Sequence, residues 1–265
     1  MCPVQLRQAQ LERNHTRTHP RENQGRDTMT IRTILAAAAL PFAALPGLAW
    51  AQEAPAEEET GAFTIEGEVG LLSDYRFRGI SLSGKEPEAT ASLTVSHESG
   101  LYASAWVSNV DLGFGQADDV EMDWTVGYSR DVGAVSLDVG GVYYTYLGQS
   151  GFNYWELYGS LGTKVGPADV KLGLAYAPKQ DNLGGDDNTY VYVSGELPFG
   201  ETPLSAHASL GWEDGVFADK KLDWSAGLAY DLGSGLTADV TYVDSHRSFT
   251  TAGDPTVVAS LKWGF

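Results

Sequence analysis

Residues 220–230, KKLDWSAGLAY, indicate the fold most clearly, because their side chains alternate between two kinds along the segment. One kind is apolar or aromatic and comprises Leu222, Trp224, Ala226, Leu228 and Tyr230. The other kind is charged, polar or small and comprises Lys221, Asp223, Ser225, Gly227 and Ala229. A period of two residues is typical of a β-strand whose two faces meet different surroundings. The segment therefore predicts a strand with one apolar face.

The same alternation recurs from residue 63 to the end of the sequence and predicts twelve strands. They are expected at 63–79, 89–98, 101–110, 119–130, 135–146, 152–164, 168–176, 188–198, 204–212, 220–230, 236–244 and 255–265. Short connections alternate with longer ones, which are expected at 80–88, 111–118, 147–151, 177–187, 213–219 and 245–254. This arrangement is typical of outer-membrane barrels. The predicted fold class is all-β, an antiparallel transmembrane β-barrel with short periplasmic turns and longer extracellular loops.

Charged residues distinguish the two faces of the predicted strands. The apolar faces carry a charge only near strand ends, at Arg130, Lys220 and Asp244. Aromatic residues gather near the ends of these faces, as in the girdles of membrane barrels, and they are Tyr75, Phe77, Tyr128, Tyr143, Tyr176, Trp212, Tyr230, Tyr242, Trp263 and Phe265. A soluble β-sandwich also alternates, but its strands usually have only about five or six residues. The continuous charge-free face favours the barrel.

The opposite faces carry the residues that we expect to line a pore. They are Glu66, Glu68, Asp74, Arg76, Arg78, Glu121, Asp123, Asp138, Glu156, Lys171, Asp223 and Asp239. Arg76 and Arg78 lie beside Asp74 near the extracellular end of the first predicted strand. They would either form a charged constriction that screens solutes or neutralise neighbouring acids such as Glu66 and Glu68. Acidic residues outnumber basic ones on this face, which predicts a preference for cations.

Large aromatic residues share the inward face, at Tyr102, Trp106, Tyr144, Tyr146, Tyr154, Tyr158, Tyr190 and Tyr192. A twelve-stranded barrel lies between filled eight-stranded barrels and open sixteen-stranded porins. We therefore expect a narrow passage for ions or small solutes that is occluded at rest. A structural or surface-recognition barrel without an open pore is the alternative. An outer-membrane hydrolase is a more distant one, because His97, His207 and His246 have no serine at a fixed spacing.

Composition excludes several other classes of protein. The chain has 265 residues, and 17 basic against 35 acidic residues give a formal net charge of −18. This balance argues against nucleic acid as a partner, because nucleic-acid binding needs a basic face. The single cysteine, Cys2, excludes a disulfide framework and a cysteine-based zinc site. No glycine-rich phosphate-binding motif opens a helix, so no cofactor is predicted.

Acidic loops offer oxygen atoms for divalent cations. The residues concerned are Asp181, Asn182, Asp186, Asp187, Asn188, Glu213, Asp214 and Asp219. They could hold calcium or bridge divalent cations to lipopolysaccharide phosphates, but their spacing is not that of an EF-hand loop. A solvated acidic surface is favoured, since isolated acids are common on exposed loops.

The N-terminal region has the features of a targeting segment. Residues 29–51 contain a basic start at Arg32, an apolar stretch at 34–45 and the cleavage site Ala49-Trp50-Ala51, as in a secretory signal peptide. We expect Met29 to be the true start and residues 1–28 a mis-assigned extension; a real basic extension is the alternative. Residues 52–62, which include the acidic stretch QEAPAEEET, should form a disordered linker before the barrel at 63–265.

Two stretches carry a family resemblance. The first is Ser73-Asp74-Tyr75-Arg76-Phe77-Arg78-Gly79-Ile80-Ser81 with Pro87 after it, and the second is Ser96-His97-Glu98-Ser99-Gly100-Leu101-Tyr102 followed by Trp106, Ser108, Asn109, Val110 and Asp111. They resemble the opening blocks of the TorF-type porin family, and a looser likeness continues to Trp263-Gly264-Phe265. The resemblance implies a signal-bearing outer-membrane barrel of Gram-negative bacteria.

The same resemblance implies partners. A terminal aromatic such as Phe265 resembles the signal read by the barrel assembly machinery. The surroundings would be outer-membrane lipid and lipopolysaccharide, and the permeants would be small solutes. Porins often form trimers, so a homo-oligomer is one of the partners that the resemblance allows. The sequence identifies no interface that would decide between a monomer and an oligomer.

Overall fold

The computed structural model describes residues 62–111 and 119–265. The predicted signal peptide at 29–51, the extension before it and nearly all of the linker lie outside the described residues, as does most of the loop expected at 111–118. Among the described residues, no helix has the length and apolar character needed to span a membrane.

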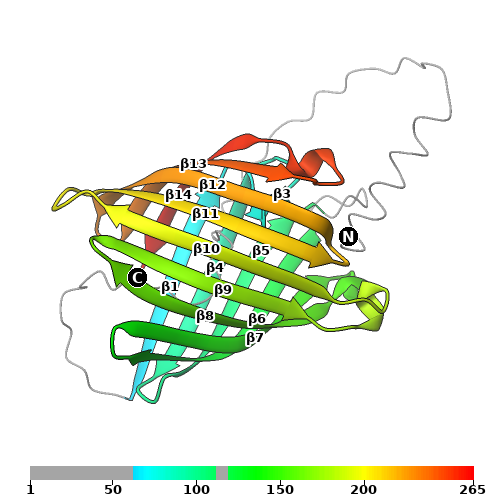
Figure 1. Cartoon of the computed structure of the whole chain (residues 1–265), viewed down its shortest axis with the longest axis horizontal. Coiled ribbons are helices and arrows are strands. Elements are labelled where there is room, and N and C mark those ends of the chain that lie inside the picture. The colour runs from blue at the N-terminus through cyan, green and yellow to red at the C-terminus, as the bar shows by residue number, and fades with distance from the viewer. Residues whose placement is uncertain (1–61, 112–118) are drawn as a thin grey trace, which may run out of the picture.

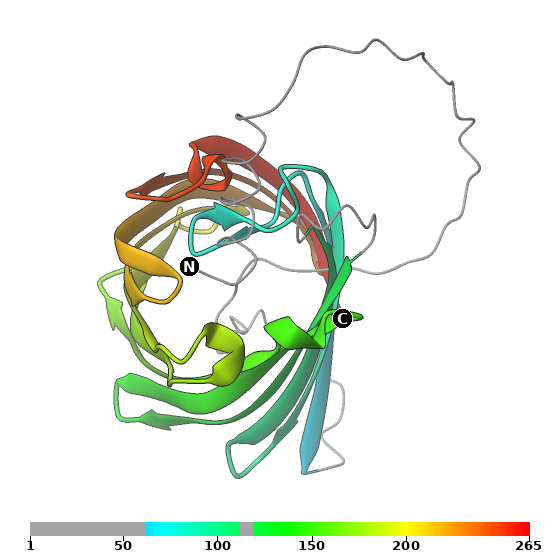
Figure 2. The ribbon, with the colours of Figure 1, turned by 90° about the vertical axis from the view of Figure 1, so that its right-hand side faces the viewer.

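Twelve strands close into an antiparallel barrel (Figures 1 and 2). They are β1 (Phe63–Leu72), β4 (Glu88–His97), β5 (Leu101–Val110), β6 (Asp119–Val132), β7 (Val135–Leu147), β8 (Tyr154–Val165), β9 (Ala168–Ala177), β10 (Asn188–Pro198), β11 (Leu204–Gly215), β12 (Ala218–Gly233), β13 (Leu236–His246) and β14 (Thr256–Gly264). Three 3₁₀ turns, η1 (Ser150–Phe152), η2 (Asp181–Leu183) and η3 (Thr251–Gly253), lie in the longer connections. The predicted fold class and strand number are confirmed, and all strand bounds but one agree within three residues.

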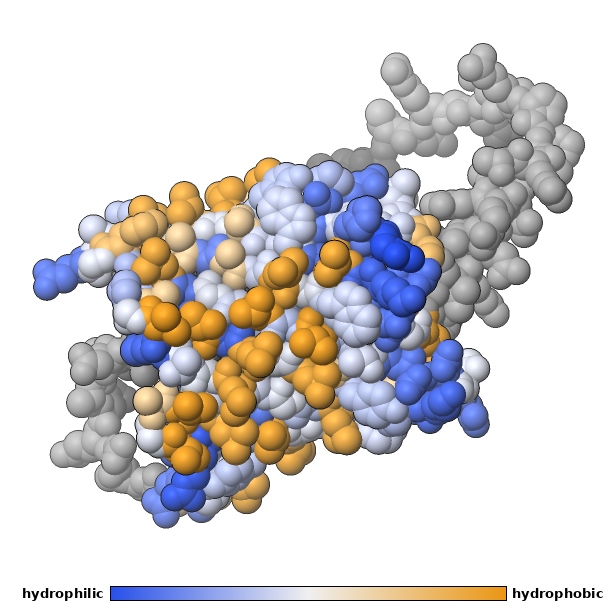
Figure 3. Space-filling view, in the orientation of Figure 1, coloured by the Kyte–Doolittle hydropathy of each residue, from blue (hydrophilic) through white to orange (hydrophobic). Residues whose placement is uncertain are grey.

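The strands place apolar residues outward, and their buried charged residues point inward. Leu71 and Val126 expose 61% and 66% of their surface, whereas Glu121 and Glu156 expose only 2% and 1%. On the face shown in Figure 3, apolar side chains lie over the strands, and hydrophilic ones gather at the right-hand end, over the longer loops. An exterior of this kind would be unfavourable in water, because it exposes a large continuous apolar area.

Exposed aromatic residues lie near both ends of this apolar surface. Those near the longer loops are Trp124, Tyr143, Trp155, Tyr176, Trp212, Trp224 and Tyr242. Those near the short turns are Phe63, Phe199, Tyr230, Trp263 and Phe265. Strand register aligns members of the first belt, because Tyr143 on β7 lies opposite both Trp124 and Trp155.

The last residue of the chain helps to close the barrel. β14 pairs with β1, and the backbone N–H and C=O groups of Phe265 and Gly67 exchange two hydrogen bonds, at 2.8 and 2.9 Å. The Phe265 ring covers Gly67 so closely that a Cβ there would lie 2.6 Å from ring atoms. Glycine at this position therefore permits the aromatic ring to complete the seam.

The first strand is shorter than predicted. β1 ends at Leu72 rather than at residue 79, and a separate two-stranded hairpin follows, made of β2 (Arg76–Phe77) and β3 (Ile80–Ser81). Tyr75, expected in the outward girdle, is only 2% exposed, and Phe77 packs against buried aromatic residues. The girdle assignment of both residues is wrong, because the alternation continues past the point where the chain turns into the barrel.

The prediction of a long loop at 213–219 is also wrong. β11 continues to Gly215 and β12 begins at Ala218, which leaves only Val216 and Phe217 between them. Phe217 is buried, and its ring centroid lies 5.1 Å from that of Tyr154. This connection therefore turns back over the interior instead of extending outward.

Candidate functional site

Residues 73–87, which we call the inner segment, fold from the end of β1 into the mouth of the barrel. Figure 2 shows their hairpin, in cyan, inside the ring of strands. Its turn has a positive φ at both Arg78 (49°) and Gly79 (81°). A type I′ hairpin turn requires this pattern, which glycine adopts readily and arginine does not. The conformation of Arg78 therefore needs support from contacts with the barrel.

Asp74 and Arg76 fasten the inner segment to the long-loop end of the barrel. Arg76 Nε donates to Asp74 Oδ2 at 2.6 Å, and Arg76 Nη1 donates to the backbone oxygens of Ala252 at 2.7 Å and Asp254 at 3.1 Å. Ser81 Oγ donates to Asp74 Oδ1 at 2.6 Å. The Asp74–Arg76 ion pair is buried within the inner segment, and the hydrogen bonds from Arg76 to Ala252 and Asp254 join this segment to the connection between β13 and β14.

Arg78 reaches across the interior to two strands of the opposite wall. Its Nη2 donates to Glu156 Oε2 on β8 at 2.5 Å, and its Nη1 donates to Glu213 Oε1 on β11 at 2.9 Å. None of the three side chains exposes more than 4% of its surface. Charge-assisted hydrogen bonds shielded from water are strong. These two contacts therefore pin the tip of the hairpin.

Lys221 on β12 extends this group of paired charges. Its Nζ lies 3.1 Å from Glu213 Oε2 and 3.0 Å from Asp223 Oδ2, and it donates a hydrogen bond to the backbone oxygen of Arg78. Tyr190 OH donates to Asp223 Oδ1 at 3.0 Å. We call the whole group the Arg78 network; its members are Arg78, Glu156, Glu213, Lys221 and Asp223. The network contains two basic and three acidic side chains.

Aromatic rings and carboxylates together keep Arg78 charged. Its guanidinium carbon lies 4.6 Å from the ring centroids of both Phe77 and Tyr190, within the range of a cation–π contact. Burial alone would lower the pKa of Arg78, but the carboxylates of Glu156 and Glu213 raise that pKa well above its usual value. The network is therefore not released by loss of the arginine proton.

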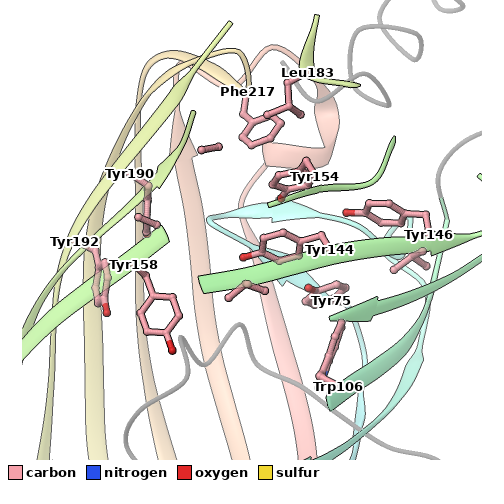
Figure 4. Close-up of a cluster of buried hydrophobic side chains, with 14 residues drawn as sticks. Tyr75, Trp106, Tyr144, Tyr146, Tyr154, Tyr158, Leu183, Tyr190, Tyr192 and Phe217 are labelled. Atoms are coloured by element: carbon pink, nitrogen blue, oxygen red, sulfur yellow. The ribbon is translucent and has the colours of Figure 1, made fainter. Parts of the chain in front are cut away.

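Inward aromatic residues form a buried cluster beside the inner segment (Figure 4). The sequence placed seven of its members on the inward face: Trp106, Tyr144, Tyr146, Tyr154, Tyr158, Tyr190 and Tyr192. Tyr75 joins them from the inner segment, with its ring centroid 5.6 Å from that of Trp106. Tyr144 and Tyr154 stack with centroids 4.5 Å apart. The cluster narrows the interior at the level of the hairpin.

The wall formed by β4 and β6 carries acids of a different kind. Glu88 is 3% exposed, and neither of its carboxylate oxygens has a hydrogen-bond partner. Glu121 accepts a hydrogen bond from Tyr146 OH at 2.8 Å through Oε1, while its Oε2 has no partner. Asp123 Oδ1 also has no partner. We call Glu88, Glu121 and Asp123 the acidic wall.

The remaining pore-lining candidates lie nearer the short-turn end of the barrel. They are Glu66, Glu68, Asp138, Lys171 and Asp239. Asp239 Oδ2 lies 2.6 Å from His207 Nε2, and Glu68 Oε1 lies 3.8 Å from Lys262 Nζ. Glu66 is exposed at the end of the strand. Structure therefore divides the twelve candidates among the inner segment, the Arg78 network, the acidic wall and the short-turn end.

The sequence did not predict three of the buried acids to be interior residues, namely Glu88, Asp119 and Glu213. Glu88 and Glu213 stand at the edges of expected loops, at 80–88 and 213–219, so the expected strand bounds exclude them. The alternation of side chains along β4 and β11 would have predicted that both residues point inward. Among the described residues, nine buried acids face four buried bases.

The acidic loops show no metal-binding arrangement. Asn188, expected as a loop residue, is buried, and its Nδ2 donates to Glu213 Oε1 at 3.1 Å inside the barrel. Asp186 is exposed; a hydrogen bond from the backbone N–H of Asp187 and the nearby Lys179 lower its pKa. Within residues 62–111 and 119–265, no group of three or more His, Cys, Asp or Glu side chains is arranged to hold a metal ion.

A closed antiparallel barrel with an apolar exterior and a charged interior is the architecture of outer-membrane porins. The KdgM porin matches with a TM-score of 0.54 at 11% identity, over 76% of this chain and 98% of that chain. A KdgM porin in complex with disordered oligogalacturonate matches with a TM-score of 0.53, again at 11% identity over 76% and 98% of the two chains. An outer membrane channel from Pseudomonas putida F1 has a TM-score of 0.49 at 9% identity, over 76% and 94%. The likeness to the KdgM porin shows a shared fold.

The chain belongs to the Gcw_chp family, described as a bacterial protein of unknown function, whose profile matches residues 56–265. No curated protein sequence matches the chain. The family description names no activity, and the match does not confirm the narrower TorF-type resemblance.

Proposed function

We propose that this protein is a porin-type channel for ions or small solutes. The observation that carries the proposal is the excess of nine buried acids over four buried bases inside a closed barrel with an apolar exterior. Buried charges are unfavourable unless they are paired or in contact with water. An interior that keeps these ionisable groups in spite of that cost is suited to charged solutes rather than to a closed apolar core.

The proposed location is the outer membrane of a Gram-negative bacterium. The two aromatic belts have the positions of interfacial girdles, and the apolar band between them matches a lipid environment. Outer-membrane lipid and lipopolysaccharide would then surround the barrel, and Phe265 would serve in recognition by the assembly machinery. The TorF-type resemblance of residues 73–81 supports the same location.

The proposed passage is narrow and favours cations. The inner segment and the aromatic cluster restrict its width, and the surplus of acids makes the electrostatic potential inside negative. The KdgM porin was solved with oligogalacturonate, a polyanion. An interior with this charge balance would disfavour such a solute, so we propose a different class of permeant for this chain.

Reconstitution tests the proposal in two steps. A folded barrel should migrate differently on a gel before and after boiling, which establishes that the purified protein is folded. In a planar bilayer with a KCl gradient, we expect single-channel currents whose zero-current potential has the sign of cation preference. Anion preference, or the absence of any current from folded protein, would contradict the proposal.

A barrel without an open pore is the second candidate. The observation that favours it is the Arg78 network, which anchors the inner segment across the interior. Such a barrel would serve a structural or surface-recognition role through its loops. It predicts no current even from variants in which the inner segment has been released.

An enzymatic role has the least support. His97 Nδ1 lies 2.8 Å from Ser99 Oγ in an exposed turn, whereas His207 on β11 pairs with Asp239 on β13, two strands away in the barrel. A hydrolase would need serine, histidine and an acid in one set. The two histidine contacts belong to separate places on β4 and β11.

A further inference from the structure

We propose that the acidic wall is a binding site for small amino alcohols, that is, solutes with an ammonium group and a hydroxyl oxygen. The site lies between the inner segment and strands β4, β5 and β6, near the long-loop end. This site adds a class of solute to the proposed channel function. Its physiological role rests on that proposed function. Binding itself can be measured independently of any current.

The first argument is the unsatisfied acceptors of the wall. Glu88 is almost completely buried, and both of its carboxylate oxygens lack a hydrogen-bond donor. Glu121 Oε2 and Asp123 Oδ1 are in the same condition. Native proteins rarely leave buried polar atoms unpaired, so each such atom needs an explanation. An ammonium group carries three N–H donors and would satisfy several of these oxygens.

The second argument is the absence of a compensating charge among the described neighbours of Glu88. Neither carboxylate oxygen of Glu88 accepts a hydrogen bond from a Lys, Arg or His side chain among the described residues. Arg76 is paired with Asp74 at 2.6 Å within the inner segment. The Arg78 network, by contrast, pairs each of its acids with a base or a hydrogen-bond donor. A bound cation would supply the missing positive charge.

The third argument concerns the kind of cation. The described residues contain no group of three or more His, Cys, Asp or Glu side chains arranged to hold a metal ion, so the cation that we propose is an organic one. Trp106 on β5 lies opposite Asp123 in the strand register, and Tyr75 packs on it from the inner segment. These rings can contact a cation through their faces.

Trp106 also offers a donor to the ligand. Its side chain is 9% exposed, yet its indole Nε1–H has no acceptor. A simple alkylammonium ion would leave this group unpaired. A hydroxyl oxygen on the same ligand would accept its hydrogen bond, so acceptors and donor together match an amino alcohol.

A titration with ethanolamine tests the inference on detergent-folded protein. Ethylene glycol serves as the matched ligand, because it has the hydroxyl groups and lacks the positive charge. Ligand-observed NMR should show saturable binding of ethanolamine and none of ethylene glycol. The variants E88Q and E121Q keep the side-chain size but remove a charge, and each should weaken ethanolamine binding by about tenfold or more.

Glu66→Gln is the control variant, because Glu66 faces inward from β1 but is exposed at the far end of the barrel. It changes net charge equally and should alter the affinity by less than about twofold. Boiling-dependent gel mobility verifies folding of every variant. Unchanged binding in E88Q and E121Q, equal losses in E66Q, or displacement of ethanolamine by stoichiometric calcium would overturn the inference.

The outcome remains separable from that of the channel experiment. Saturable ethanolamine binding to a barrel that carries no current would contradict only the channel function. A cation-selective current from a barrel that does not bind ethanolamine would contradict only the site.

Discussion

Two sides of the same barrel interior differ in whether their buried charged groups have partners. On the side formed by β8, β11 and β12, Arg78 and Lys221 are paired with acids at distances between 2.5 and 3.1 Å. On the side formed by β4 and β6, Glu88 and Glu121 keep carboxylate oxygens without partners. The first side is satisfied from within the chain and holds the inner segment in place. The second is not satisfied from within the chain, and it is the side we assign to solutes.

This difference separates charges that stabilise the structure from charges that are available for function. Removing one member of a buried pair leaves its partner uncompensated and is strongly destabilising. Removing an acid that has no partner should have the opposite effect on stability. Substitutions on the two sides therefore test the comparison directly.

The largest effect is expected from Arg78→Ala. It leaves Glu156 and Glu213 without their common partner, and the free energy of unfolding should fall by about 3–5 kcal/mol. Single-channel conductance should rise several-fold, because the tip of the inner segment is released. Urea unfolding followed by gel mobility and bilayer recordings measure the two effects.

Arg247→Ala is the control for that variant. Arg247 pairs with Asp219 at 3.2 Å on the exposed surface, with about half of each side chain accessible. Its loss should change stability by less than about 1 kcal/mol and leave conductance unchanged. Equal effects of R78A and R247A would show that the Arg78 network does not hold the inner segment.

Gly79→Ala is the next test, because it disturbs the same hairpin without removing a charge. A Cβ at Gly79 would lie 2.2 Å from Ser245 Oγ and 2.7 Å from Asp223 Cβ. We expect a loss of about 3 kcal/mol, of which about 1–2 kcal/mol comes from the left-handed backbone and the rest from overpacking. Gly133→Ala supplies the comparison in the same urea experiment, since Gly133 also has a positive φ but open space around its Cβ position. If the two variants lose equal stability, the hairpin does not pack against the wall as described.

Neutralising the acidic wall should change selectivity more than stability. In the double variant E88Q/E121Q, the zero-current potential in a KCl gradient should move toward zero, because two negative charges leave the passage. The free energy of unfolding should rise by about 1 kcal/mol, since two buried acids with unpartnered oxygens lose their charge, while a glutamine oxygen at position 121 can still accept the hydrogen bond from Tyr146. A decrease in the free energy of unfolding comparable to that of R78A would mean that the acidic wall also stabilises the structure. E66Q is the control, because it removes one negative charge outside the acidic wall.

The smallest effect is expected from Lys164→Ala. Lys164 Nζ lies 2.8 Å from Asp169 Oδ2 at the short-turn end, and its side chain is 73% exposed. Water and salt screen such a pair, so the change in unfolding free energy should be below about 0.5 kcal/mol. Ion selectivity should not change measurably; a clear shift would place this end of the barrel on the limiting part of the passage.

The strand pattern could be predicted because it depends on local alternation. Every strand has an apolar environment on one side and a charged interior on the other. Each segment therefore shows, by itself, an alternation of apolar and polar side chains with a period of two residues. Strands β5 and β10 begin and end at the predicted residues, and the inward aromatic residues of β7, β8 and β10 are buried as expected. The number of strands and the alternating connections then indicate a closed barrel.

Alternation by itself carries no information about where a chain leaves the wall. Residues 73–79 continue the pattern of β1, yet positive φ values at Arg78 and Gly79 turn them into the interior. The partners of Arg78 are 78 and 135 residues away in the sequence, on strands that meet it only after the barrel has closed. The barrel, its apolar exterior and its acidic interior could therefore be predicted from local alternation. Which acids are paired depends on distances across the interior rather than on neighbours along a strand, so the pairs become visible only in the folded barrel.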